Sequence, residues 1–149
     1  MIIIKKDVFS GLRRPISTTL FGTNKTWRGF VVVPFVNAFF VYWLNLLADF
    51  QVSNALILGF TLGFAYMLFE LPNSFLKRRL GIESGQQATK HRLLFMLIDK
   101  MDSAFGVTLV YFLLGCISLP HALLLFGISS STHIIISQLL VHLHLKKSF

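Results

Sequence analysis

Long apolar stretches separated by short polar segments dominate the chain. Residues 29–48 carry no formal charge, and twenty helical residues at a rise of 1.5 Å cover the roughly 30 Å hydrocarbon core of a bilayer. Further apolar stretches run from about 55 to 73, from about 93 to 116 and from about 119 to 142. This pattern predicts an all-α, polytopic membrane protein with about four transmembrane helices.

Polar segments and turn-forming residues mark the ends of these spans. Residues 1–28 are basic and rich in Gly, Pro, Ser and Asn, so we expect irregular structure there. Pro72 is expected to kink the end of the second span, and the polar loop 74–92 follows it. Residues 103–145 contain no Asp, Glu, Lys or Arg, and this uncharged stretch is too long for one span. Residues 118–121 supply the break between two spans.

The composition supports a membrane protein. Of the 149 residues 54% are hydrophobic and only 13% are charged, whereas soluble domains carry roughly a quarter charged residues. The length suits a single domain, residues 1–149. A soluble fold of this size could not bury so much apolar surface, but a lipid-facing fold need not.

The charge distribution predicts the orientation. The net charge of +8 comes from 14 Lys and Arg against 6 Asp and Glu. With four spans, both termini and the 74–92 loop share one side, and the basic residues fall on or near it, while the turns at 49–54 and 117–121 have none. The bias of Lys and Arg in short loops makes that side cytoplasmic. Such a charge suits anionic headgroups or phosphates, and we expect no nucleic-acid partner.

Three carboxylates, those of Glu70, Asp99 and Asp102, lie within or beside the spans, where a charged side chain is costly. Asp99 and Asp102 are three positions apart, so a helix places them on one face. A shared divalent cation would relieve their repulsion, and Mg²⁺ commonly uses one or two carboxylates together with substrate phosphates. The alternative is a helix start at the interface, with both carboxylates paired to Lys100 or Arg92.

The end of the second span carries a matching polar stripe. Glu70, Ser74, Lys77 and Arg78 follow at helical spacing, and Asn73 is adjacent. A carboxylate, an amide, a hydroxyl and two cations on one stripe are typical of a surface that binds phosphate and metal. The alternative is a basic anchor that only ends the span on the cytoplasmic side.

The segment GTNKTWRG at residues 22–29 is the third polar element. Lys25 and Arg28 flank Thr26 and Trp27, and glycines at both ends permit close backbone approach. The spacing is not that of a Walker A loop. An interfacial Trp with basic anchors is the alternative. Because the topology brings all three elements to the cytoplasmic side, we expect chemistry between a soluble phosphate compound and a lipid.

These motifs resemble a known superfamily. NSFLKRRLGIESG (73–85) followed by DKMDSAFG (99–106) is similar to the signature of the CDP-archaeol synthase and CDP-diglyceride synthetase (phosphatidate cytidylyltransferase) superfamily. GTNKTWRGF (22–30) and LRRPI (12–16) resemble its archaeal-type branch. The resemblance covers nearly the whole chain, with three separate motifs in the same order.

The resemblance implies a CTP-dependent cytidylyltransferase that converts a membrane lipid phosphate, phosphatidate or an archaetidic-acid-like lipid, to its CDP-lipid and releases pyrophosphate. Mg²⁺ would be the cofactor, and CTP and the lipid phosphate the partners. The expected catalytic residues are Lys77, Arg78, Asp99 and Asp102; the expected metal ligands are Asp99, Asp102 and Glu70; the expected substrate-binding residues are Lys25, Thr26, Arg28, Asn73 and Ser74.

The resemblance also sets expectations for membrane and assembly. It implies a prokaryotic inner membrane with the active site facing the cytoplasm, and a homodimer is one compatible assembly. Relatives of the archaeal type usually have a fifth span before the basic segment, whereas four residues precede Lys5 here, so we expect either that this span is missing or that the start codon is misplaced. This motivates an alternative hypothesis: a degenerate, non-catalytic membrane protein that binds lipid headgroups or partner proteins.

Overall fold

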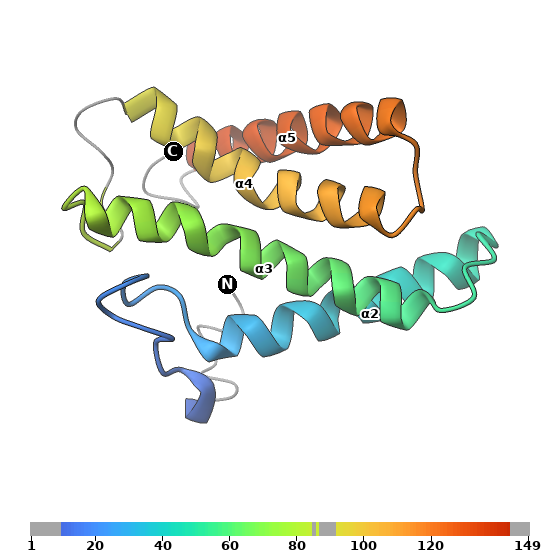
Figure 1. The fold of residues 1–149 in the computed structure, drawn as a ribbon, viewed down its shortest axis with the longest axis horizontal. Helices are drawn as coiled ribbons and strands as arrows, with labels where there is room; N and C mark the ends of the chain where they lie inside the picture. The colour runs from blue at the N-terminus through green and yellow to red at the C-terminus, as the bar shows by residue number, and fades with distance from the viewer. Residues whose placement is uncertain (1–9, 85, 87–91, 144–149) are drawn as a thin grey trace.

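The fold is a row of antiparallel helices. The computed structural model describes residues 10–84, 86 and 92–143, and within them it contains a short 3₁₀ turn and four long helices (Figure 1). Their bounds are η1 Ser10–Leu12, α2 Trp27–Ala48, α3 Ala55–Arg79, α4 Arg92–Leu113 and α5 Leu119–His142. The predicted all-α class is confirmed, and the fourth predicted span has the observed bounds of α5.

Consecutive helices pack side by side. In the described residues, α2 packs on α3, α3 on α4 and α4 on α5. The starts of α2 and α4 lie at the same end of the molecule as the ends of α3 and α5 (Figure 1). That arrangement brings the segment before α2 and the end of α3 to one end, as the predicted four-span topology requires.

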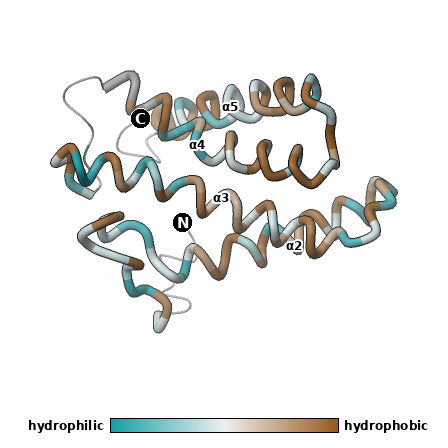
Figure 2. The backbone as a smooth tube through the Cα atoms, viewed as in Figure 1, coloured by the Kyte–Doolittle hydropathy of each residue, from teal (hydrophilic) through white to brown (hydrophobic). Residues whose placement is uncertain are grey.

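The apolar surface indicates contact with lipid. Large hydrophobic side chains are exposed along the helices, and Leu47 is 76% exposed. Figure 2 shows hydrophobic residues along most of α2 and the second half of α4. A surface of this kind is stable only where lipid or another apolar partner covers it. Among the described residues α2, α3 and α5 are long and apolar enough to cross a membrane.

The helix α4 does not meet that criterion, although the sequence predicts a span here. Its charged residues extend to Asp102, so only residues 103–113 form an uncharged run within the helix. That run is shorter than the roughly 20 residues that a bilayer core needs. The packing of α4 between α3 and α5 keeps it within the bundle. Its crossing of the membrane stays a prediction.

The second long helix extends further than the sequence predicts. We expect the span to end near Asn73, yet α3 continues through Pro72 to Arg79. A proline removes one backbone hydrogen bond, which a long packed helix can tolerate. The helix ends where Gly81 adopts a φ of 73°, and its N–H donates to the Arg78 carbonyl at 3.1 Å. Lys77, Arg78 and Arg79 therefore lie on a helix and not in a loop.

Small residues hold α2 close to α3. A Cβ added at Gly59 would lie 2.6 Å from the Ala38 Cα atom, and one at Gly63 would lie 2.7 Å from the Pro34 Cα atom. The Asn37 Nδ2 atom donates to the Gly59 carbonyl at 2.6 Å across the same interface. Small residues one turn apart allow this backbone approach between membrane helices. The helix α2 therefore packs closely on α3 and supports the helix whose last turns carry the polar residues.

Candidate active site

A buried amide on α3 joins the two carboxylates of α4. The Asn73 Nδ2 atom donates to Asp99 Oδ1 at 2.5 Å and to Asp102 Oδ2 at 3.0 Å. Asn73 is only 6% exposed. Because Asp99 and Asp102 are three positions apart, both face α3, as their spacing predicts. The hydrogen bonds fix the rotation of α4 against α3 and hold the carboxylates together.

A lysine on the same face of α3 offsets part of their charge. Lys77 lies one turn after Asn73, and its ammonium group forms an ion pair with Asp99. On the other carboxylate, Asp102 Oδ1 accepts a hydrogen bond from the Ser103 backbone N–H at 2.6 Å. Lys100, between the two aspartates in sequence, donates to Ser137 Oγ of α5. Asp99 thus obtains a cation from α3, which neither hypothesis for these carboxylates predicts.

The segment before α2 binds a second face of α3. Lys25 forms an ion pair with Glu70, and Ser74 Oγ donates to the Glu70 carbonyl at 2.9 Å. The backbone of Lys25 is also fixed, because its carbonyl accepts a hydrogen bond from the Ile16 N–H at 2.9 Å. Thr26 pairs with Pro15 in an isolated antiparallel bridge. This segment is therefore irregular, as predicted, but fixed to α3.

Gly22 brings the same segment against the end of α3. It has a φ of 82°, and a Cβ there would lie 2.9 Å from Ser84 Oγ and 3.5 Å from an Arg78 guanidinium nitrogen. The Nε atom of Arg78 is buried, and no hydrogen-bond partner for it lies among the described residues. Arg28 is also buried, in the first turn of α2. Two cations, Arg78 at the end of α3 and Arg28 at the start of α2, therefore belong to this end of the fold.

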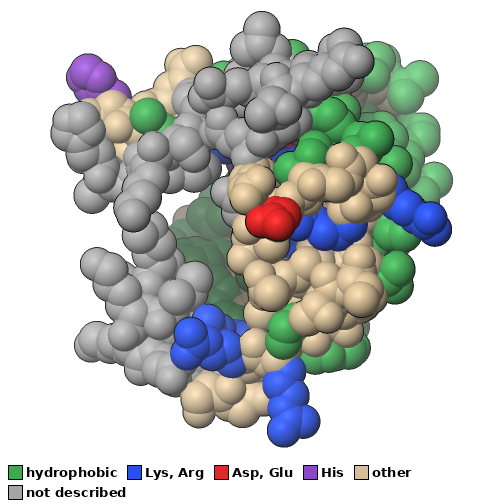
Figure 3. Space-filling model, turned by 90° about the vertical axis from the view of Figure 1, so that its left-hand side faces the viewer, with side chains coloured by type: hydrophobic (Ala, Val, Ile, Leu, Met, Phe, Trp, Pro, Cys, Tyr) green, Lys and Arg blue, Asp and Glu red, His purple; other side chains and the backbone are tan. Residues whose placement is uncertain are grey.

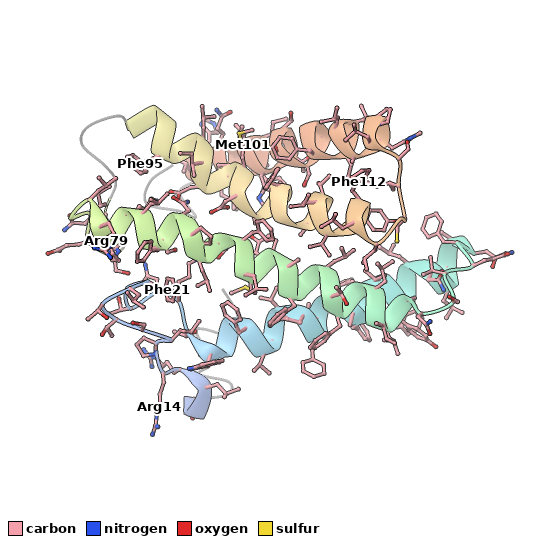
Figure 4. The ribbon with its side chains drawn as sticks, viewed as in Figure 1. Arg14, Phe21, Arg79, Phe95, Met101 and Phe112 are labelled. Atoms are coloured by element: carbon pink, nitrogen blue, oxygen red, sulfur yellow. The ribbon has the colours of Figure 1, made fainter. Side chains whose placement is uncertain are left out.

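The predicted stripe on α3 divides between two neighbours. Asn73 and Lys77 face α4, whereas Glu70 and Arg78 face the segment before α2. Figure 3, which views this end of the molecule, shows Lys and Arg side chains around an acidic one. Figure 4 places Phe21 and Arg79 at the same end. Lys25 and the predicted site residues of α3 and α4 thus gather around the last three turns of α3, whereas Thr26 and Arg28 lie at the start of α2.

The donor set fits a magnesium ion. Asn73 Oδ1 is buried beside the two carboxylates and has no hydrogen-bond partner among the described residues. An amide oxygen and two carboxylates are hard ligands that suit Mg²⁺, which completes its shell with water and substrate phosphates. Glu70 lies outside this set, because it pairs with Lys25 and is not joined to the aspartates by Asn73. Asp99 also pairs with a lysine, Lys77, so an ion bound there would compete with that ammonium group. No group of three or more His, Cys, Asp or Glu forms a metal cluster in the described chain. A metal role for Glu70 stays a prediction without this support.

Comparison with known proteins identifies the family. The family model for CDP-archaeol synthase, CarS-like, matches residues 16–149. The chain belongs to the CDP-archaeol synthase family. Every residue of the candidate active site lies within the matched part of the chain.

Two relatives show how close the likeness is. A CDP-archaeol synthase of Staphylothermus marinus is 30% identical over 131 residues, which are 85% of this chain and 69% of the relative. A CDP-archaeol synthase of Thermococcus gammatolerans is 33% identical over 91 residues, which are 59% of this chain and 53% of the relative. No solved structure matches the chain.

Sequence reasoning placed Asn73 among the residues of this CDP-archaeol synthase-like site but missed what it does. Its bonds to Asp99 and Asp102 depend on how α3 and α4 face each other, and no local pattern records that. The Lys25–Glu70 pair was missed for the same reason, because 45 residues separate its members. The one available signal was the position of Asn73 a turn before Lys77, on the same face of the helix.

Proposed function

We propose that this protein is a CTP-dependent cytidylyltransferase that converts a membrane lipid phosphate to its CDP-activated lipid and releases pyrophosphate. Family membership supports the reaction, and the names of both relatives support an archaeol-type lipid phosphate as the substrate. The observation that carries the proposal is the cluster of Asp99 and Asp102 held by Asn73 beside Lys77. Cations and carboxylates in one cluster suit a reaction between two phosphate compounds.

The reaction needs positioning and charge neutralisation more than a reactive side chain. An oxygen of the lipid phosphate attacks the α-phosphorus of CTP and forms the new P–O bond. The bond between the α-phosphorus and the oxygen that bridges to the β-phosphorus breaks, and pyrophosphate leaves with that electron pair. Lys77 and Arg78 lie where cations could offset the charge of these phosphates.

Magnesium belongs to the proposal as the cofactor. Asp99, Asp102 and Asn73 Oδ1 would hold it, with phosphate oxygens as further ligands. When bound, it would draw charge from the triphosphate and so favour the departure of pyrophosphate. The chain's own part is to hold the two carboxylates on one side of α4, which Asn73 does through its amide group.

The remaining polar residues of the site are suited to binding CTP or the lipid phosphate, and their position bears on the orientation in the membrane. Lys25, Thr26 and Arg28 lie in or beside the segment that packs on α3, and we assign them to the binding of CTP or of the lipid phosphate. CTP is a cytoplasmic compound, so we place this end of the bundle on the cytoplasmic side of a prokaryotic inner membrane. The bias of Lys and Arg supports the same orientation.

The decisive experiment measures product formation. Purified protein would be incubated with Mg²⁺, CTP labelled at the α-phosphate and vesicles that contain either archaetidic acid or phosphatidate. We expect label in the lipid fraction and equal release of pyrophosphate, with a preference for the ether lipid. If no lipid phosphate becomes labelled, the enzymatic proposal is wrong and the headgroup-binding alternative replaces it. Stabilisation by CTP and Mg²⁺ in a melting experiment gives an independent measure of nucleotide binding.

A further inference from the structure

The hydroxyl of Tyr66 lies between two residues of the site. It is within hydrogen-bonding reach of Glu70, one turn later on α3, and of Ser103 on α4. Glu70 is a carboxylate paired with a lysine, and a carboxylate can only accept a hydrogen bond. The Tyr66 hydroxyl therefore donates to Glu70, and its oxygen accepts from the Ser103 hydroxyl. Neither the sequence motifs nor the proposed reaction assigns a role to Tyr66.

Both partners of Tyr66 hold a further residue of the site. Glu70 forms the ion pair with Lys25 that attaches the segment before α2. The Ser103 backbone N–H donates to Asp102 Oδ1 at 2.6 Å. The two oxygens of a carboxylate offer several acceptor positions, so Glu70 can accept from both of its partners. Tyr66 is therefore the central member of a continuous polar connection from Lys25 to Asp102.

This connection gives α4 a second attachment to α3. The first attachment is Asn73, whose amide holds Asp99 and Asp102. Tyr66 precedes Asn73 on the same helix by about 10 Å along the axis. One attachment point fixes the rotation of α4 but leaves the helix free to tilt, whereas two separated points fix both. The contact between Tyr66 and Ser103 therefore constrains the direction in which the carboxylates of α4 lie.

Contacts from α4 and α5 hold the ring of Tyr66. Ser103 is only 2% exposed. A Cβ added at Gly106, one turn after Ser103, would collide with the ring of Phe69, so α3 and α4 are in close contact at this level. From α5, the His133 ring stacks on the Tyr66 ring, with centroids 6.4 Å apart and an angle of 28° between the planes. The hydroxyl of Tyr66 thus has a defined position between α3 and α4.

We propose that Tyr66 is a positioning residue for the proposed metal site. Its contact with Ser103 aligns Asp102, and its contact with Glu70 makes this alignment depend on the attachment of the segment before α2. This inference rests on the proposed function for the identity of the metal and of the reaction. Metal binding can be measured without turnover, so the inference and the proposed function are tested separately.

The first test measures metal binding by the full-length protein in detergent, without CTP or lipid phosphate. Mn²⁺ replaces Mg²⁺, because EPR distinguishes bound from free Mn²⁺. Tyr66→Phe removes only the hydroxyl, and we expect it to weaken Mn²⁺ binding about tenfold. Tyr42→Phe, at a 44% exposed position of α2, is the matched control and should leave the affinity unchanged.

Two outcomes of this measurement would overturn the proposal. A folded Tyr66→Phe variant with unchanged Mn²⁺ affinity would show a role in stability alone, even if its melting temperature falls. A wild-type protein that binds no Mn²⁺ would remove the metal site and this inference with it.

The second test asks whether Tyr66 acts through Ser103. Ser103→Ala removes the hydroxyl but keeps the backbone N–H that donates to Asp102, so we expect the same loss of Mn²⁺ affinity, about tenfold. The double variant should bind Mn²⁺ no more weakly than either single variant, because all three lack the same hydrogen bond. Independent effects would multiply to about 100-fold and contradict the connection. Ser103→Ala also serves alone if Tyr66→Phe fails to fold.

Kinetics separate positioning from contact with a substrate. In the reaction of CTP with the lipid phosphate, we expect Tyr66→Phe to lower kcat about tenfold and to change either KM less than about twofold. A raised KM with unchanged kcat would place Tyr66 against a substrate and exclude the positioning role. A wild-type protein whose Mn²⁺ binding depends on Tyr66 but that forms no CDP-lipid would contradict the proposed reaction alone. An active wild-type protein that Tyr66→Phe matches in Mn²⁺ affinity and kcat would contradict this inference alone.

Discussion

Lys25, two residues before α2, forms an ion pair with Glu70 of α3, although 45 residues separate them in sequence. Both side chains are about one fifth exposed. The pair attaches the basic segment to the face of α3 that does not meet α4. It therefore determines where the cations of that segment lie relative to the carboxylates of α4.

A charge reversal tests this attachment. Lys25→Glu should repel Glu70, lower the melting temperature in detergent and reduce turnover, because the segment leaves α3. The double variant Lys25→Glu with Glu70→Lys should recover the melting temperature, since it restores opposite charges. Recovery of stability without recovery of turnover would assign Lys25 to substrate as well as to the pair. Failure of the double variant to recover stability would show that the pair does not hold the segment.

Replacing either aspartate should abolish the reaction. Asp99→Asn and Asp102→Asn each remove a negative charge from the proposed magnesium site, so turnover should fall by about 10³-fold or more. The measurement is CDP-lipid formation at saturating Mg²⁺, with size-exclusion profiles to show that the variants are folded. Asp49→Asn, in the turn after α2 at the opposite end, is the matched control. Near-wild-type rates in either site variant would remove the metal assignment.

Loss of the amide that joins the aspartates should be less severe. Asn73→Ala removes both hydrogen bonds while the carboxylates remain, so we expect turnover to fall by about 10- to 100-fold. The variant should also need more Mg²⁺ for half-maximal activity, because Asn73 Oδ1 is a proposed ligand. Leu76→Ala, at an exposed position of the same helix, is the control. An unchanged magnesium requirement would exclude Asn73 from the metal site.

The packing of α2 on α3 should depend on Gly59. A side chain there would lie 2.6 Å from the backbone of Ala38, so Gly59→Leu should force the helices apart and lower the melting temperature by several degrees or prevent folding. Gly127→Ala is the control, since a Cβ at Gly127 of α5 meets nothing within 4 Å. Comparable melting temperatures for both variants would contradict the close approach.

The sequence predicts elements better than the contacts between them. The bounds of α5 follow from an uncharged run and the break at Pro120, because both are local signals. The prediction that the second span ends near Asn73 is wrong, because α3 continues through Pro72 to Arg79 and a long packed helix tolerates the loss of one hydrogen bond. Spacing correctly put Asp99 and Asp102 on one face. It could not show that Lys77 faces them while Arg78 faces away, since neighbouring positions on a helix differ by about 100° in direction.

The position of α3 between its two neighbours has a mechanical consequence. Its last turns bind the segment before α2 on one side and the carboxylates of α4 on the other. A shift of one residue in its rotation, about 100°, would break the contacts on both sides at once. The rotation of this one helix therefore sets both sides of the site: the cations of the segment before α2 and the carboxylates of α4 are aligned together or not at all.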